Sequence, residues 1–306
     1  MGMKRGEKGN VAVLVAVGMA FLIGSAALAV DVAEAYRVRN HLEDVATLSA
    51  LAGAQVLYKG ESAARAAAEA TAGGGTLGSE VDVTGVHIYV ESSRPGGPKD
   101  QVRVKVEGVA YFRFAPALGY KEQALSFEAA ARAGRLIGLR GVVPLGIPDQ
   151  ELEFGKIYQL KSDNPMVPGN FGALAPGDRG ASEYEKLIAE GYDGYLQVGD
   201  RLYTEPGNMK GPTKRGIQAR IAKDPDATCQ TVKPNSPRII YVPVVDFSKA
   251  KGRSEVPILG FAAFFLIGTD DGSTVTGCFL QMVAPGDWGG LDEGRDYGTY
   301  GVGLVR

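Results

Sequence analysis

The sequence predicts an α+β protein in which a single N-terminal transmembrane helix continues into a long helix packed on a small antiparallel sheet, followed by a β-rich C-terminal domain. Three observations support this fold class: an uncharged apolar run near the N-terminus, an unbroken helical pattern after it, and alternating apolar runs later in the chain. The length of 306 residues exceeds one average domain, and a net charge of −2 argues against a dedicated nucleic-acid binder.

The apolar run covers Val11–Val30, twenty residues without a charge. At about 1.5 Å per residue, a helix of this length spans about 30 Å, which matches the hydrocarbon core of a bilayer. Basic residues in segment 1–10 predict a cytoplasmic N-terminus and an exported C-terminal bulk. The competing interpretation is a cleaved signal peptide, because Ala27–Ala29 has the small-x-small form that signal peptidase accepts. The length of the run favours an uncleaved anchor.

Asp31 follows the apolar run, and no Pro or turn signal interrupts the chain before Lys59-Gly60. Residues three and four apart in this stretch form one helical stripe, so we expect one helix of nearly fifty residues. Small side chains allow two helix backbones to approach closely, which predicts that the second half of this helix contacts partner helices. The candidate contact residues are Ala46, Ser49, Ala50, Gly53 and Ala54.

Several motifs in this region occur in a characteristic order. A basic start and a Gly-containing apolar span lead to ALAVDV at Ala27–Val32, then to Tyr36 and to LAGA at Leu51–Ala54. In this order and spacing, Gly9–Ala54 resembles the N-terminal region of Tad (tight adherence, Flp pilus-assembly) proteins of the TadG-like kind. The later segment Val102–Gly119 resembles the alternating strand and F-x-x-x-L-G element of the same family.

The resemblance implies a membrane protein with a pilin-like long helix, anchored in the bacterial inner membrane. Its implied partners are membrane lipid around residues 11–30 and other pilus-assembly or pilin-like subunits, with no nucleic acid. Processed members of the family are cut after a Gly and carry a Glu five residues into the mature chain. A cut after Gly9 would place Leu14 there, and no acid lies within the apolar run. We therefore expect an unprocessed, TadG-like protein.

Residues 31–139 are predicted to form an exported α+β module. A short helix is expected over Glu61–Ala72, ended by three consecutive Gly residues. The expected strands are Val81–Glu91, Gln101–Phe114 and Leu125–Ala133.

Residues 140–283 are predicted to form a β-rich domain with one clear helix, Ser182–Glu190. The expected strands are Ile157–Lys161, Ile239–Phe247, Ile258–Gly268 and Val275–Val283, of which the last three read as a meander. The apolar segment Ile258–Gly268 is too short for a second membrane span. The Gly-rich tail, residues 284–306, is expected to be a covering loop or flexible.

Cys229 and Cys278 are the two cysteines of the chain, and both fall in the exported part. An even pair in an oxidising compartment predicts one disulfide, although two unrelated thiols remain the alternative. Closure of a loop of about fifty residues would stabilise the fold by about 4 kcal/mol in the chain-entropy model.

The segment Thr204–Gly216 is a candidate binding loop, in which backbone N–H groups and basic side chains could hold an anion. Its candidate residues are Gly207, Asn208, Lys210, Gly211, Lys214 and Arg215. The spacing does not fit a phosphate-binding P-loop, so a structured Pro/Gly turn with a solvated basic edge is the favoured interpretation.

No catalytic, cofactor-binding or metal-binding residues are expected. The chain has two His and two Cys, and no His follows His87, so His-dependent nucleophilic catalysis in the C-terminal half is excluded. We therefore expect a structural or assembly component of the envelope apparatus. One alternative is a membrane-tethered exported hydrolase with Thr204–Gly216 lining its site. The other is a surface- or carbohydrate-binding module that uses Trp288, Tyr297 and Tyr300.

Overall fold

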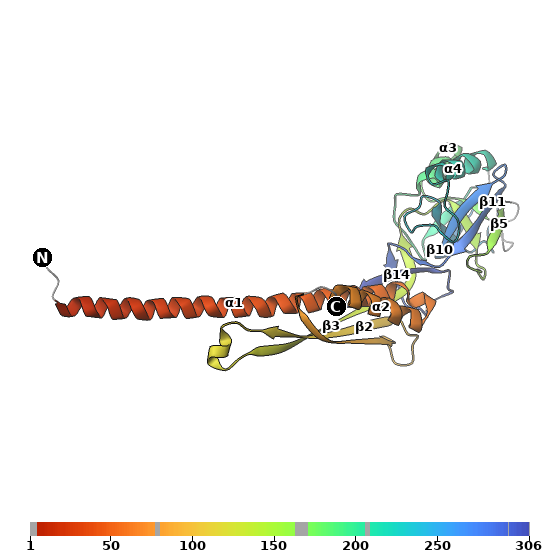
Figure 1. Ribbon diagram of the computed structural model, residues 1–306. Helices are drawn as coiled ribbons and strands as arrows, with labels where there is room; N and C mark the ends of the chain where they lie inside the picture. Colours follow the sequence, from red (N-terminus) through yellow and green to blue (C-terminus); the bar gives the residue numbers. More distant parts are fainter. Residues whose placement is uncertain (1–4, 77–79, 163–170, 206–208, 293, 306) are drawn as a thin grey trace. The chain divides into compact units, whose positions relative to one another are not determined.

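The computed structural model describes residues 5–76, 80–162, 171–205, 209–292 and 294–305, with side chains from residue 11 onward. The chain forms two compact units. The first unit comprises Met1–Ser93, Gln101–Arg132 and Leu304–Arg306, and the second comprises Arg94–Asp100 and Ala133–Gly303. The predicted α+β class is confirmed: a long apolar helix begins the chain, and a β-rich region follows (Figure 1).

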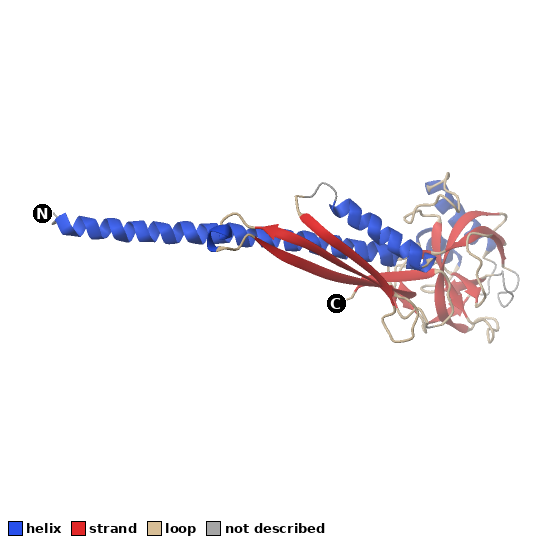
Figure 2. Ribbon diagram, turned by 60° about the horizontal axis from the view of Figure 1, so that its bottom comes forward, coloured by secondary structure: helices blue, strands red, loops and turns tan. Residues whose placement is uncertain are grey.

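The first unit begins with α1 (Arg5–Gln55), a continuous helix of 51 residues, as the unbroken pattern predicts. A short 3-10 turn, η1 (Leu57–Lys59), reverses the chain into α2 (Glu61–Thr76), which lies beside the second half of α1 (Figure 2). Ala residues four apart on α2 are buried in this contact: Ala64, Ala68 and Ala72.

The helix α2 is longer than expected, because it continues through Gly73–Gly75 instead of ending there. A Cβ atom at Gly75 would lie 3.1 Å from Val45 Cγ2 of α1. Since glycine carries no side chain, the end of α2 can stay close to α1, and this tertiary contact offsets the low helix propensity of the three glycines.

The sheet of the first unit is built from β1 (Asp82–Glu91), β2 (Gln101–Tyr111) and β3 (Glu122–Leu139), paired antiparallel in that order. Along β2, alternate residues are buried under α1, in agreement with the period-two pattern. The connection from β2 to β3 contains a second 3-10 turn, η2 (Ala115–Leu118). The strand β3 is longer than predicted, and the chain passes into the second unit within it, after Arg132.

The core sheet of the second unit has the order β5-β11-β10-β8-β6-β4-β9, and β9 also pairs with β10. The pairings β10-β8-β6-β4-β9-β10 therefore close into a ring of strands. The bounds are β4 (Leu145–Pro148), β5 (Ile157–Lys161), β6 (Gly172–Ala175), β8 (Arg201–Thr204), β9 (Ile239–Val245), β10 (Glu255–Thr269) and β11 (Thr274–Leu280). The antiparallel order β9-β10-β11 is the predicted meander.

Two helices cover this unit, α3 (Ala181–Glu190) and α4 (Lys210–Lys223), and they pack against each other. Ile188 of α3 and Ile217 of α4 are fully buried with Phe264 and Phe279 from the sheet. The two Phe rings meet edge to face with their centroids 4.8 Å apart.

The Gly-rich C-terminal tail is not an irregular loop, contrary to one expectation. It forms β13 (Asp287–Trp288) and β14 (Thr299–Leu304). The strand β14 pairs in parallel with β12 (Met282–Val283), and β13 pairs with β3, as does β7 (Leu196–Gln197). These pairings join residues far apart in sequence, which the composition of the tail could not reveal.

Candidate functional site

The first candidate site is the apolar half of α1. All residues from Val11 to Val30 are exposed except Ala27, which is half-buried, although most of them are strongly apolar. This is the one helix in the described chain that is long and apolar enough to cross a membrane. Exposure of an apolar stretch about 30 Å long is costly in water and favourable in lipid, so this segment supports a single-pass membrane anchor.

Asp31 follows the uncharged exposed run and is the first buried residue after Val11, with 3 % exposure. Its carboxylate accepts backbone N–H bonds from Arg113 (2.7 Å), Phe114 (3.1 Å) and Ala115 (2.6 Å). These donors lie at the start of η2, in the connection from β2 to β3. Asp31 therefore attaches this connection to α1 directly after the apolar run.

The environment of Asp31 favours its ionised form. Burial of the carboxylate raises its pKa, but the three N–H bonds, together with the charge of Arg113, outweigh burial, and the pKa lies below the usual value of 3.8. The sequence showed an acid directly after the apolar run, but the partners of this acid lie more than eighty residues away and were not predicted.

The small residues in the second half of α1 contact elements of the same chain. Ala46, Ser49, Ala50, Gly53 and Ala54 are all buried. A Cβ at Gly53 would lie 2.9 Å from Val102 Cγ1 of β2 and 3.0 Å from the carbonyl oxygen of Ala64 of α2. The expectation that this face contacts partner helices is therefore corrected, because α2 and β2 already cover it.

The candidate binding loop is largely a helix. Gly207 and Asn208 lie outside the described residues, whereas Lys210, Gly211, Lys214 and Arg215 belong to the first turns of α4. Arg215 pairs with Glu185 of α3 at 2.6 Å, and Lys210 lies 4.0 Å from Asp271. Lys210 and Arg215 therefore form ion pairs within the second unit. The prediction of a basic loop is corrected, because the described part of the segment is mostly helical.

The same helix is positioned by close contacts with α3. The hydroxyl of Thr213 donates to the carbonyl oxygen of Met209 at 2.8 Å, and Thr213 is buried beside Tyr184. A Cβ at Gly216 would lie 2.7 Å from Ile188, so glycine at this position permits the close approach of the two helices.

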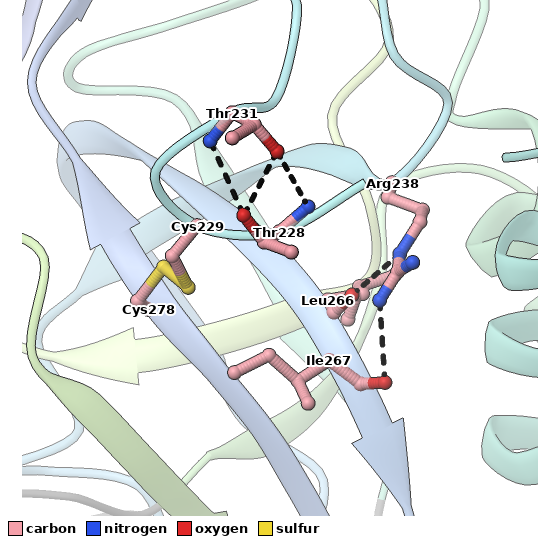
Figure 3. Close-up of a disulfide and its surroundings, with 7 residues drawn as sticks. All are labelled: Thr228, Cys229, Thr231, Arg238, Leu266, Ile267 and Cys278. Atoms are coloured by element: carbon pink, nitrogen blue, oxygen red, sulfur yellow. Dashed lines mark hydrogen bonds between the residues drawn. A yellow bond between two sulfur atoms is a disulfide. The ribbon is translucent and has the colours of Figure 1, made fainter. Parts of the chain in front are cut away.

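A second candidate site is the segment between α4 and β9, which a disulfide holds against the sheet. Cys229 of this segment is bonded to Cys278 of β11, with 6.5 Å between the Cα atoms. Thr228 and Thr231 bond to each other through their hydroxyls at 2.8 Å and close the turn beside the disulfide (Figure 3). Both cysteines thus contribute to the stability of the second unit.

Arg238 holds the two ends of this segment together. Its guanidinium donates to the carbonyl oxygen of Leu266 at 2.9 Å (Figure 3). It also donates to the carbonyl oxygens of Asp224 and Pro225, both at 3.0 Å, and lies 4.6 Å from the ring centre of Phe265. Hydrogen bonds from a charged guanidinium to several carbonyl oxygens are stronger than those between neutral groups, so they stabilise this segment. This arrangement accounts for Arg238 as a structural residue.

The C-terminal aromatics do not form a binding surface. Tyr297 and Tyr300 are 7 % and 4 % exposed, and their hydroxyls donate to Asp149 (2.9 Å) and Asp296 (2.8 Å). Trp288 is half-buried, and its ring occupies the space that a side chain at Gly301 would need. The interpretation of these three residues as a carbohydrate-binding surface is therefore wrong, because they pack inside the second unit.

The described surface has several shallow depressions. A groove of about 490 Å³ lies between α2 and β1 in the first unit, and it is lined by Arg65, Glu69 and His87 among others. A second groove of about 490 Å³ borders α3, and a cavity of about 150 Å³ lies beside Tyr297. Within the described ranges, no group of three or more His, Cys, Asp and Glu side chains is arranged to hold a metal ion.

Comparison with known proteins identifies the N-terminal region. Residues 9–56 match the model of the Tad family, described as Flp pilus-assembly TadE/G-like. The match ends just beyond α1, so the resemblance seen in the sequence is confirmed for this helix, and the resemblance at Val102–Gly119 stays a prediction. No curated protein and no solved structure matches the chain.

Proposed function

We propose that the chain is a non-catalytic, single-pass membrane component of a Tad/Flp-type pilus or a related bacterial envelope apparatus, with a structural or assembly role. The observation that supports this most strongly is the coincidence of the family match, residues 9–56, with α1. This helix combines an exposed apolar half with a half that packs on its own sheet, so it joins a membrane anchor rigidly to a folded unit.

Charge and redox chemistry support an orientation with the folded units on the exported side. Lys and Arg residues precede Val11, which favours a cytoplasmic N-terminus, and the disulfide between Cys229 and Cys278 is stable in an oxidising compartment. The two folded units therefore lie on the exported side of the inner membrane. The partners are other pilus-assembly or pilin-like subunits, in addition to the lipid around residues 11–30.

Deletion of the gene in its host tests this role. We expect loss of surface pili in electron micrographs and loss of surface adherence, with both restored by the full chain. A chain without residues 11–30 should fail to restore them, whereas Lys249→Ala, an exposed substitution in the second unit, should restore them fully. Normal piliation and adherence in the deletion strain would refute the proposed role.

A further inference from the structure

The connection between β2 and β3 carries an exposed apolar tip, which we define as residues 112–121. Phe114, Leu118 and Tyr120 are 50 %, 79 % and 70 % exposed. A tight antiparallel connection needs only a short polar turn, so several large apolar side chains at its end are not required by the hairpin itself. A cluster of this kind indicates a surface that is covered in the functional protein.

Hydrogen bonds fix the position of the tip along the axis of α1. The bonds from Asp31 to the backbone of Arg113, Phe114 and Ala115 attach it at the residue that follows Val30, where the exposed apolar half of the helix ends. Both views of the molecule show the connection between β2 and β3 beside α1 (Figures 1 and 2). If residues 11–30 fill the hydrocarbon core, the tip must lie at the level of the lipid headgroups.

The composition of the tip suits that environment. Tyr and other aromatic side chains are favoured at the membrane interface, because one end of the ring is apolar and the other end remains hydrated. Arg113 and Lys121 flank the apolar residues, with Glu122 as the neighbouring acid. Basic side chains next to apolar ones gain further attraction from anionic headgroups.

We propose that the tip inserts its apolar side chains into the interface of the bilayer leaflet from which α1 emerges. The inference rests on the proposed membrane anchor and adds a second lipid contact to it. Lipid is the favoured occupant because the tip is continuous with the end of the membrane span and carries basic flanks. With both α1 and the tip in lipid, the first unit cannot rotate about the axis of α1. A single helix in lipid leaves this rotation free.

Site-specific labelling of the full chain in vesicles tests the tip. Both native cysteines are bonded to each other, so Leu118→Cys provides one reactive thiol for an environment-sensitive nitrobenzoxadiazole label without reductant. The matched control is Tyr89→Cys, also exposed, on β1. Tyr89 pairs with Arg103, about 25 Å from the end of β2 at about 3.3 Å per residue.

The proteins are reconstituted in phosphatidylethanolamine–phosphatidylglycerol vesicles, with and without nitroxide-labelled lipid. We expect the label at position 118 to show blue-shifted emission and to lose most of its intensity with nitroxide lipid, while the label at position 89 changes little. Phe114→Ser with Tyr120→Ser should reduce the quenching at position 118, because the neighbouring apolar contacts are lost while the backbone bonds to Asp31 remain.

Three results would overturn the inference in different ways. Quenching at position 118 no greater than at position 89, in chains that resist carbonate extraction, would refute lipid contact and leave the anchor intact. If the label were shielded from aqueous iodide but not quenched by nitroxide lipid, another copy of the chain would be the occupant. Release of the chain by carbonate would refute the membrane anchor, and the lipid contact of the tip with it.

Discussion

The carboxylate of Asp31 accepts the backbone N–H of Ala115 at 2.6 Å, a bond between residues 84 positions apart in the sequence. It joins the residue after the apolar run to the connection between two strands of the sheet. Between Val11 and Val30 every residue except the half-buried Ala27 is exposed, whereas Asp31 and several residues after it are buried. Asp31 therefore attaches the connection between β2 and β3 to α1, in addition to the packing of α2 and β2 on the second half of the helix.

Asp31→Ala should release the connection between β2 and β3 from α1. Three backbone N–H groups lose their acceptor, and we expect amide protection at Arg113, Phe114 and Ala115 to fall by about tenfold or more. Hydrogen exchange followed by mass spectrometry on the full chain in detergent measures this loss. Glu43→Ala, a substitution of an exposed acid farther along α1, is the control and should leave these amides unchanged.

The contribution of Asp31 should depend on pH in a defined direction. Its native pKa lies below 3.8, so its stabilising effect is fully present above that value and is lost as the pH falls through the native pKa. Thermal unfolding of the wild type and of Asp31→Asn should therefore differ at pH 6 and converge as the pH decreases toward 2. A difference that stayed constant over this range would show that the carboxylate charge is not involved.

Gly53→Ala should destabilise the first unit by about 1–3 kcal/mol, since the added methyl group would overlap with buried neighbours in β2 and α2. Gly74→Ala is the matched control: this glycine also lies in a helix, but no atom lies within 4 Å of its Cβ position. We expect that change to be neutral or to stabilise by about 0.5–1 kcal/mol. Urea unfolding compares the two, and equal effects would contradict the close packing at Gly53.

Removal of the disulfide by Cys229→Ala with Cys278→Ala should lower the free energy of unfolding of the second unit by about 4 kcal/mol in the chain-entropy model. The wild type treated with reductant should unfold at the same urea concentration as the double variant. Reductant should have no effect on the double variant itself, which serves as the control. A wild-type midpoint that does not respond to reductant would argue against this contribution.

The intact mass of the native protein tests whether the N-terminus is processed. From the membrane fraction we expect the mass of the full chain, with two alkylated cysteines only after reduction. A mass that begins at Asn10 would indicate a processed pilin subunit, in spite of Leu14 at the fifth position. A mass that begins at Val30 would indicate a cleaved signal peptide and a secreted protein.

Prediction from the sequence succeeded where local periodicity was strong. The run of small and apolar residues three and four apart predicted α1, and alternating Val residues predicted β2. Prediction failed where distant contacts override local preference. Lys210–Lys223 begins with two glycines, a proline and several cations, which suggested a loop, yet its packing on α3 makes it a helix. The prediction for the C-terminal tail failed for the same reason, because the strand β14 forms only by pairing with other strands.

The sequence by itself determined the apolar run of Val11–Val30, the long helix that contains it and the number of cysteines available for pairing. These features depend on residues close together in the chain, where periodicity and composition are sufficient. Only the tertiary structure decided what the small residues of α1 contact, where Tyr297 and Tyr300 are buried, and which backbone groups Asp31 binds. Each of these depends on which distant segments pack together, and local periodicity does not contain that information.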